Sequence, residues 1–174
     1  MDGASRYNAV AGPGPAVKHL ANQEESERVG NIRDAEGSAL VLRTDGASRG
    51  NPGHAAAGVV VETPAGEPIA TGKHYLGVMT NNQAEYRALI LGLKAVAHFH
   101  PSRVSVFMDS ELVVKQMLGQ YKVRDAALES LWREARALAA ALPAVSFTHV
   151  LRGKNAQADK LANEALDEQA RAGR

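Results

Sequence analysis

The sequence predicts an α/β domain whose strands and helices follow the order βββαβααβα. Three observations support this fold class. Three short β-prone runs precede the first helical period, and each later strand-like run is followed by an amphipathic helix. The 174 residues, 45% hydrophobic and 22% charged, are typical of one globular domain with modest extras.

No run approaches the roughly 18 to 20 apolar residues of a membrane helix, and no signal-peptide pattern opens the chain. We therefore expect a cytoplasmic monomer without membrane contact.

The first 37 residues carry no sustained apolar period. They are punctuated by glycine and proline at residues 12–15 and then become polar and acidic. Such a composition does not support a packed core. We expect residues 1–37 to form a disordered or loosely docked tail and residues 38–174 to form the domain.

The three β-prone runs predict an antiparallel meander. Residues 40–44 form the first strand, which ends at Asp45 and Gly46 and is followed by a turn-rich loop at residues 50–53. Residues 56–62 and 69–76 form the next two strands.

The first helix begins at Thr80 or Asn81, either of which is a typical N-cap. Its apolar residues recur at helical spacing as far as Phe99, and Pro101 ends it. Residues 104–108 then predict a fourth strand.

The rest of the chain supplies three helices and one strand. Ser110 caps a short helix that ends at Gly119, and a longer helix covers residues 125–142. Residues 145–151 predict the fifth strand. A basic loop at residues 152–154 leads into the last helix.

Four acidic residues are expected to gather at one edge of this sheet. The first and fourth strands are linked through a helix, so as neighbours they are parallel, and Asp45 and Asp109 follow their carboxyl ends. Ligands bind at such edges in open α/β sheets. Glu85, in the first turns of the crossover helix, and Asp159, at the start of the last helix, lie near the packed helix faces.

Four clustered carboxylates repel one another unless cations lie among them. Oxygen ligands favour Mg²⁺ or Mn²⁺, and two such ions roughly 3.5–4 Å apart can activate water and stabilise the leaving oxygen of a phosphodiester. Each acid also has an ordinary structural interpretation. Asp45 precedes a glycine and is typical of a turn, Asp109 can cap a helix, and Glu85 and Asp159 can be solvated helix residues.

Composition excludes several other chemistries. The absence of cysteine excludes disulfides, thiolate metal sites and thiol nucleophiles. The chain also lacks a nucleophile elbow, a zinc-protease helix and a Walker loop. The net charge of +1 rises to about +3 for the domain without its acidic tail, which permits a nucleic-acid partner without arguing for one.

Four stretches of the chain together resemble the motifs of the type 1 ribonuclease H family. They are residues 44–53, 80–86, 108–110 and 155–162, in that family's order and within the same element pattern. The resemblance implies a ribonuclease H fold, with a five-stranded mixed sheet flanked by helices. It also implies an endoribonuclease that cuts the RNA strand of RNA/DNA hybrids with two divalent metal ions, leaving 5′-phosphate and 3′-hydroxyl ends. By position, Asp45, Glu85, Asp109 and Asp159 become the metal-binding catalytic acids.

The same matching implies a set of substrate-binding residues. An enzyme that distinguishes RNA from DNA must read the 2′-hydroxyl. The family positions for this contact map to Ser48, Gly50, Asn51, Asn81 and Asn82. The position of Thr80 resembles the residue that grips a DNA-strand phosphate. Taken alone, Asn81 and Asn82 are equally typical of helix caps.

The sequence departs from the family pattern in two places. Many members carry a mobile histidine shortly before the final aspartate, and here there is none; strand alternation predicts that His149 is packed instead. We expect Arg152 to replace the missing histidine by acting on the phosphate or the leaving oxygen. The basic handle of some members is also missing, since residues 119–124 are short, and Glu111 stands where an amide often touches RNA.

Three alternatives remain open from the sequence. The enzyme can cleave double-stranded RNA as well as, or instead of, hybrids. A non-catalytic hybrid-binding module would keep the fold without needing all four acids. A transposase or integrase would also cluster acids, but its DNA substrate would leave Asn81 and Asn82 without a 2′-hydroxyl to read.

Overall fold

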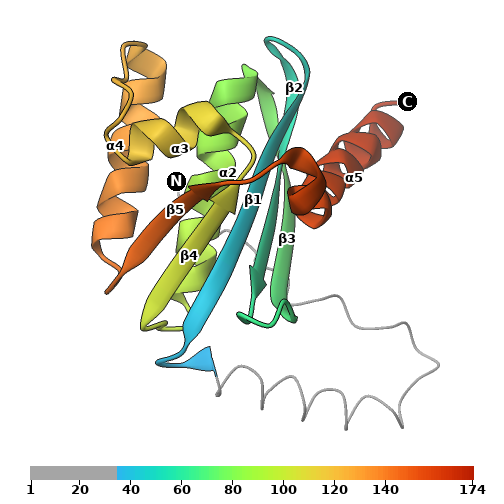
Figure 1. Cartoon of the computed structure of the whole chain (residues 1–174). Helices are drawn as coiled ribbons and strands as arrows, with labels where there is room; N and C mark the ends of the chain where they lie inside the picture. The colour runs from blue at the N-terminus through green and yellow to red at the C-terminus, as the bar shows by residue number, and fades with distance from the viewer. Residues whose placement is uncertain (1–34) are drawn as a thin grey trace, which may run out of the picture.

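The computed structural model describes residues 35–174 and contains one five-stranded sheet (Figure 1). The strands lie in the order β3-β2-β1-β4-β5. Their bounds are Ala39–Gly50 for β1, Gly53–Glu62 for β2, Pro68–Met79 for β3, Arg103–Met108 for β4 and Val145–His149 for β5. Pairing is antiparallel from β3 to β1 and parallel from β1 to β5, so the predicted mixed sheet is confirmed.

The helices cover both faces of the sheet. Figure 1 shows α2, α3 and α4 on one face and α5 on the other. Their bounds are Asn81–Ala97 for α2, Glu111–Met117 for α3, Ala126–Ala140 for α4 and Ala156–Ala172 for α5, with a short 3₁₀ helix, η1, at Arg152–Asn155. The predicted order βββαβααβα is therefore confirmed, with η1 added where a basic loop was expected.

Two apolar clusters hold these layers together. The larger lies between the sheet and α2, α3 and α4, and it includes the fully buried Leu42, Leu89 and Val106. The smaller lies under α5 and consists of Ala56, Ala165 and Leu166 with Ala47 packed against it. Since α5 buries mainly small side chains, its backbone approaches the sheet closely.

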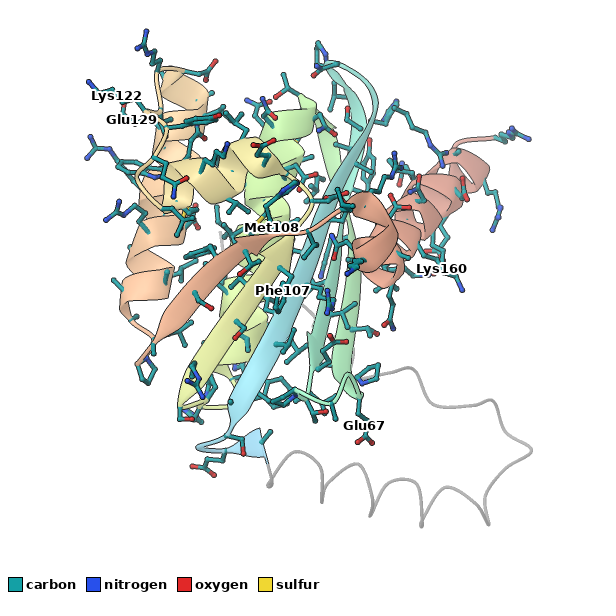
Figure 2. The ribbon with its side chains drawn as sticks, viewed as in Figure 1. Glu67, Phe107, Met108, Lys122, Glu129 and Lys160 are labelled. Carbon is teal, nitrogen blue, oxygen red and sulfur yellow. The ribbon has the colours of Figure 1, made fainter. Side chains whose placement is uncertain are left out.

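The end of β4 shows how the two faces differ. Figure 2 labels Phe107 and Met108, which alternate across the strand. Met108 is fully buried in the larger cluster, whereas the Arg43 guanidinium covers the Phe107 ring at 4.9 Å from its centroid. One face of β4 is thus part of the main core and the other is covered by a charged side chain.

The first strand is longer than expected. The sequence predicts that it ends at Asp45, but β1 continues to Gly50 because residues 45–50 pair with residues 53–58 of β2. Its parallel pairing with β4 stops earlier, at Arg43 and Phe107. Asp45 therefore lies within a strand, directly beyond the point where β1 leaves β4.

The prediction for His149 is wrong. Alternation placed it on the same face as Phe147, but β5 is an edge strand that ends at His149, and the side chain is exposed. Met108 of β4 pairs with His149, but this backbone pairing does not cover the histidine side chain. Leu151, which strand alternation places on the same face as His149, is also exposed, at 74%.

The predicted tail lies mostly outside the described residues, which begin at residue 35. Within them, Ala35 is buried in the main core and the Gly37 N–H donates to the His100 carbonyl. Among residues 35–174, no helix is both long and apolar enough to cross a membrane.

Candidate active site

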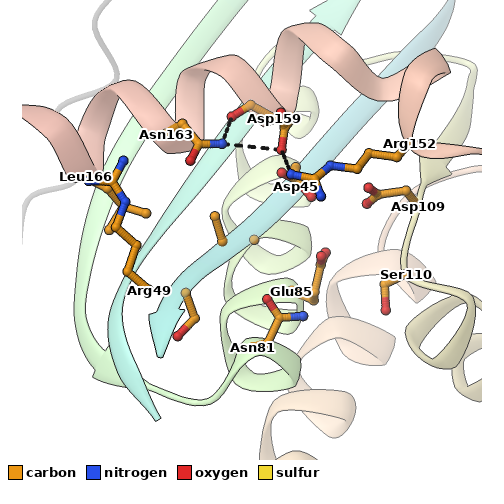
Figure 3. A pocket seen from close by; sticks show the side chains of 13 residues that line it. Asp45, Arg49, Asn81, Glu85, Asp109, Ser110, Arg152, Asp159, Asn163 and Leu166 are labelled. Carbon is orange, nitrogen blue, oxygen red and sulfur yellow. Dashed lines mark hydrogen bonds and ion pairs between the residues drawn. The ribbon is translucent and has the colours of Figure 1, made fainter. Parts of the chain in front are cut away.

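Three of the four predicted acids form a compact cluster at the edge where β1 leaves β4. Asp45 comes from β1, Glu85 from the first turns of α2, and Asp109 directly follows β4. One carboxylate oxygen from each lies within 4.8 Å of the other two. Figure 3 shows the three side chains converging on one space.

Two acids of the cluster are buried, Asp109 is half-buried, and two of the carboxylate oxygens lack partners. Asp45 is 4% exposed and Glu85 is 5% exposed. Among the described residues, Glu85 Oε2 and Asp109 Oδ1 are buried without a hydrogen-bond partner. Buried carboxylate oxygens left unpaired in this way are costly, so the site fits an added cation.

The surroundings of the acids disfavour their charged forms. Burial, together with the neighbouring Asp109 and Asp159, raises the pKa of Asp45 to about 8. Burial also raises the pKa of Glu85, with Asp45 and Asp109 adding to the effect, while a backbone hydrogen bond from Gly46 opposes it. Cations would reverse this pressure by favouring the ionised carboxylates.

Two glycines allow the helices to bring their acids to the sheet. A Cβ atom on Gly46 would overlap the backbone of Ala84 and Glu85, and one on Gly58 would overlap the carbonyl of Ala158. Only glycine therefore permits α2 and α5 to pack this closely on β1 and β2. Neither contact leaves a local signal in the sequence, since the partners lie far apart along the chain.

The fourth acid, Asp159, stands beside the cluster on the first turn of α5. Its Oδ1 accepts from Arg152 Nη2 at 3.1 Å and from Asn163 Nδ2 at 3.3 Å, and its carbonyl accepts from the same Asn163 nitrogen at 3.0 Å (Figure 3). The Asp159 charge contributes to the raised pKa of Asp45. Asp159 thus faces the cluster, although it is not one of the three acids whose oxygens lie within 4.8 Å.

The acids lie in an open cavity of about 350 Å³. Seven of the predicted site residues line it: Asp45, Ser48, Asn81, Glu85, Asp109, Arg152 and Asp159. The other four, Gly50, Asn51, Thr80 and Asn82, do not. Arg49 and Asn163 also line it and were not predicted; the spacing of four residues between Asp159 and Asn163 on one helix was the available signal.

The predicted substrate-binding residues form a connected rim beside the cavity. The Ser48 hydroxyl donates to the Gly50 carbonyl and, at 3.2 Å, to the Met79 carbonyl. The Asn81 N–H donates to Asn51 Oδ1 at 3.1 Å, which ties the turn after β1 to the start of α2. Asn82 is exposed on the same turn.

Thr80, rather than Asn81, is the N-cap of α2. Its hydroxyl accepts from the Gln83 N–H at 3.3 Å, and Gln83 Oε1 accepts from the Thr80 N–H at 2.9 Å, which completes a capping box. The Thr80 hydroxyl keeps its proton in this arrangement and can still donate to a phosphate oxygen.

The fold and the acid cluster agree with the family model that matches this chain. A family model described as reverse transcriptase-like matches residues 43–165, which contain all four acids. Within that class, ribonuclease HI of Halobacterium salinarum is 47% identical over 137 residues, covering 79% of this chain and 69% of the relative. The chain belongs to the ribonuclease H family.

Two further comparisons extend this result. The bifunctional protein Rv2228c of Mycobacterium tuberculosis is 43% identical over 129 residues, which are 74% of this chain but only 35% of that protein. This chain therefore matches about a third of the length of that relative. The structure of LC11-RNase H1 in complex with an RNA/DNA hybrid has a TM-score of 0.73 and 40% identity, covering 75% of this chain and 99% of that one.

Proposed function

We propose that this protein is an endoribonuclease that hydrolyses the RNA strand of RNA/DNA hybrids with two divalent metal ions, Mg²⁺ or alternatively Mn²⁺. The observation that carries the proposal is the buried cluster of Asp45, Glu85 and Asp109, with unpaired oxygens, inside an open cavity. The hybrid bound by LC11-RNase H1 supports the choice of substrate.

The acids would hold the metal. Asp45, Glu85, Asp109 and Asp159 supply only oxygen ligands, which suit Mg²⁺ and Mn²⁺. Bound there, the ions would supply Lewis-acid chemistry, lowering the pKa of an attacking water and neutralising charge on the leaving oxygen, so that the products carry 5′-phosphate and 3′-hydroxyl ends.

The chain's own residues would place the RNA strand over these acids. Ser48 and Gly50 at the end of β1 and Asn51 directly after it, with Asn81 and Asn82 at the start of α2, offer the donors and acceptors that a 2′-hydroxyl needs. The bond between the Asn81 N–H and Asn51 Oδ1 supports this role, because it fixes the two groups relative to each other. The Thr80 hydroxyl would hold a phosphate of the DNA strand.

Arg152 would act on the scissile phosphate or the leaving oxygen, in place of the family's mobile histidine. Its guanidinium lines the cavity, and its side chain is 76% exposed while paired with Asp159. A cation held at the mouth of the site in this way can stabilise negative charge that develops on a phosphate.

Cleavage of four end-labelled substrates tests the proposal. They are an RNA/DNA hybrid, double-stranded RNA, single-stranded RNA and double-stranded DNA, each with Mg²⁺, Mn²⁺ or chelator. We expect metal-dependent cutting of the hybrid's RNA strand, reduced at least about 100-fold by Asp109→Asn. Cutting of double-stranded RNA would broaden the substrate range.

Two results would contradict the proposal. Cutting of DNA with the hybrid left intact would favour the transposase or integrase alternative. Binding of the hybrid without cleavage under either metal would favour a non-catalytic module.

A further inference from the structure

We propose that Asn155 is a positioning residue of this site, which ties the start of α5 to β1 and thereby sets where Asp159 stands relative to Asp45. The inference rests on the proposed function, because it concerns how the fourth acid reaches the other three. Asn155 does not line the cavity, so it acts through Asp159 and not on the substrate.

The side chain of Asn155 bonds to β1 and not to its own helix. It occupies the N-cap position of α5, where asparagine ordinarily accepts a hydrogen bond from its own helix, yet it makes no such bond. Instead, Asn155 Nδ2 donates to the carbonyl of Thr44 at 2.9 Å, across 111 positions of sequence. Thr44 is the residue directly before Asp45, so the bond fixes α5 beside the first acid.

The neighbouring residues make the same connection. Arg43 Nη1 donates to the Lys154 carbonyl at 3.0 Å, and Arg43 is itself held by Glu62 at 2.6 Å. Two successive residues of β1 therefore hold two successive residues of η1. The close approach of the Ala158 carbonyl to Gly58 supplies a third contact, one turn further along.

Asp159 needs this connection more than the other acids do. Asp45 lies within a paired strand, and Glu85 lies on a helix packed into the main core. The pairing of β5 with β4 ends near residue 150, where the Val150 N–H donates to the Met108 carbonyl, and the following segment is exposed. Asn155 is the first fully buried residue after that segment, at 1% exposure.

Because Asn155 and Asp159 are close on α5, the hydrogen bond from Asn155 to Thr44 also positions Asp159. Asn155 and Asp159 are four positions apart at the start of one helix, so they lie on the same side of it. Asn155 Oδ1 is buried without a hydrogen-bond partner among the described residues. A buried amide that leaves its oxygen unpaired is unfavourable for folding alone, which points to a role in the site.

Comparison of Asn155→Ala with a matched control tests the role. The control is Gln116→Ala, since Gln116 is also a buried amide, bonded to Tyr86 Oη and the Lys122 carbonyl, but lies outside the cavity. We expect Asn155→Ala to lower kcat on the hybrid by about 10- to 100-fold with KM changed less than about threefold, and Gln116→Ala to leave both nearly unchanged.

A second readout does not depend on turnover. Calorimetric titration of the substrate-free protein with Mn²⁺ should show weaker binding for Asn155→Ala, by about 10-fold, resembling Asp159→Asn. Introducing Asn155→Ala into Asp159→Asn should then add little further loss of Mn²⁺ affinity or of kcat, because the first residue acts through the second. If Asn155→Ala does not fold, Asn155→Ser, which keeps a hydroxyl donor, replaces it.

The outcomes separate this inference from the proposed function. Equal losses in Asn155→Ala and Gln116→Ala, or single losses that multiply in the double variant, would overturn the positioning role while leaving the nuclease intact. A wild-type protein that binds Mn²⁺ but cuts no hybrid would overturn the proposed function, and the Mn²⁺ titrations would still decide the role of Asn155. Absence of Mn²⁺ binding in the substrate-free wild type would overturn the role of Asn155 in metal binding, while cleavage of the hybrid would still decide the proposed function.

Discussion

The ion pair between Arg152 and Asp159 would be affected by cations bound at the acids. In the structure the guanidinium neutralises part of the acid charge, at 3.1 Å from Asp159 Oδ1. Cations bound at the acids would compete for the same carboxylate, and the long arginine side chain, largely in solvent, can turn toward a phosphate instead. This exposure distinguishes Arg152 from the buried Asp45 and Glu85.

Replacement of Arg152 by alanine tests its role at the residue scale. We expect kcat for hybrid cleavage to fall about 10- to 100-fold, with KM changed by less than about threefold, because the positive charge acts mainly on the reacting phosphate. Steady-state kinetics at saturating metal measures both constants. Lys154→Ala, an exposed change in the same 3₁₀ turn, is the control. Unchanged turnover in Arg152→Ala would show that the missing histidine has no substitute here.

The packing of helices on the sheet is decided at the scale of elements. Neither α2 nor α5 could lie at its observed height over the strands if Gly46 or Gly58 carried a side chain. The positions of Glu85 on α2 and Asp159 on α5 therefore depend on the absence of side chains at Gly46 and Gly58.

Gly58→Ala should displace α5 from the sheet. The added methyl meets the Ala158 backbone, which cannot rotate away as a side chain can, so we expect a loss of about 1–3 kcal/mol in the free energy of unfolding. Urea denaturation gives the value. Gly153→Ala is the control, because a Cβ there meets nothing within 4 Å. A loss no larger than that of the control would mean that α5 adjusts at no cost.

The sequence was most informative where a local signal defines an element. The cap at Ser110 predicted the start of α3, and helical spacing predicted α4 closely, although Asp125 is the N-cap of α4 and not its first helical residue. The extension of β1 to Gly50 could not be read locally, because its pairing partners in β2 define it and its own residues have little β-propensity. His149 was misplaced because alternation gives the side of a strand but not whether anything covers that side.

The site shows the same division. The motif spacing predicted the acids, and the topology placed Asp45 and Asp109 at one edge. The bond from Asn155 to Thr44 spans 111 positions and leaves no periodic signal, so sequence reasoning did not identify it. Contacts of this kind follow from the fold and become visible only with it.

At the scale of the whole molecule, the acid cluster links stability to pH and metal. Asp45 has a pKa of about 8 in the folded protein, against an ordinary value of 3.8, and the pKa of Glu85 is also raised by burial. A carboxyl whose pKa is raised on folding contributes its stabilisation below its ordinary pKa and loses it as the pH rises through the folded value.

The metal-free protein should therefore become less stable between pH 5 and pH 8, a range in which ordinary surface carboxylates are already ionised. Asp45→Asn should flatten this dependence and be more stable than the wild type at pH 8 by about 1–3 kcal/mol. Urea unfolding in chelator at several pH values measures the effect. Added Mn²⁺ should restore stability to the wild type through binding to the folded state. Stability that rises with pH in chelator would contradict the prediction.

The double pairing of β1 has a consequence for kinetics. Val41 pairs with Glu62 on the adjacent strand of the meander and with Ser105 on the distant β4, so the hairpin can form from local contacts while the parallel pair must wait for a long loop to close. Asp45 meets Asp109 only after that closure, and Asp159 only once α5 has docked. Repulsion among the acids therefore destabilises the completed fold but does not affect the hairpin of β1 and β2, which forms before the acids meet. A bound cation that relieves the repulsion should therefore lower the unfolding rate more than it raises the folding rate.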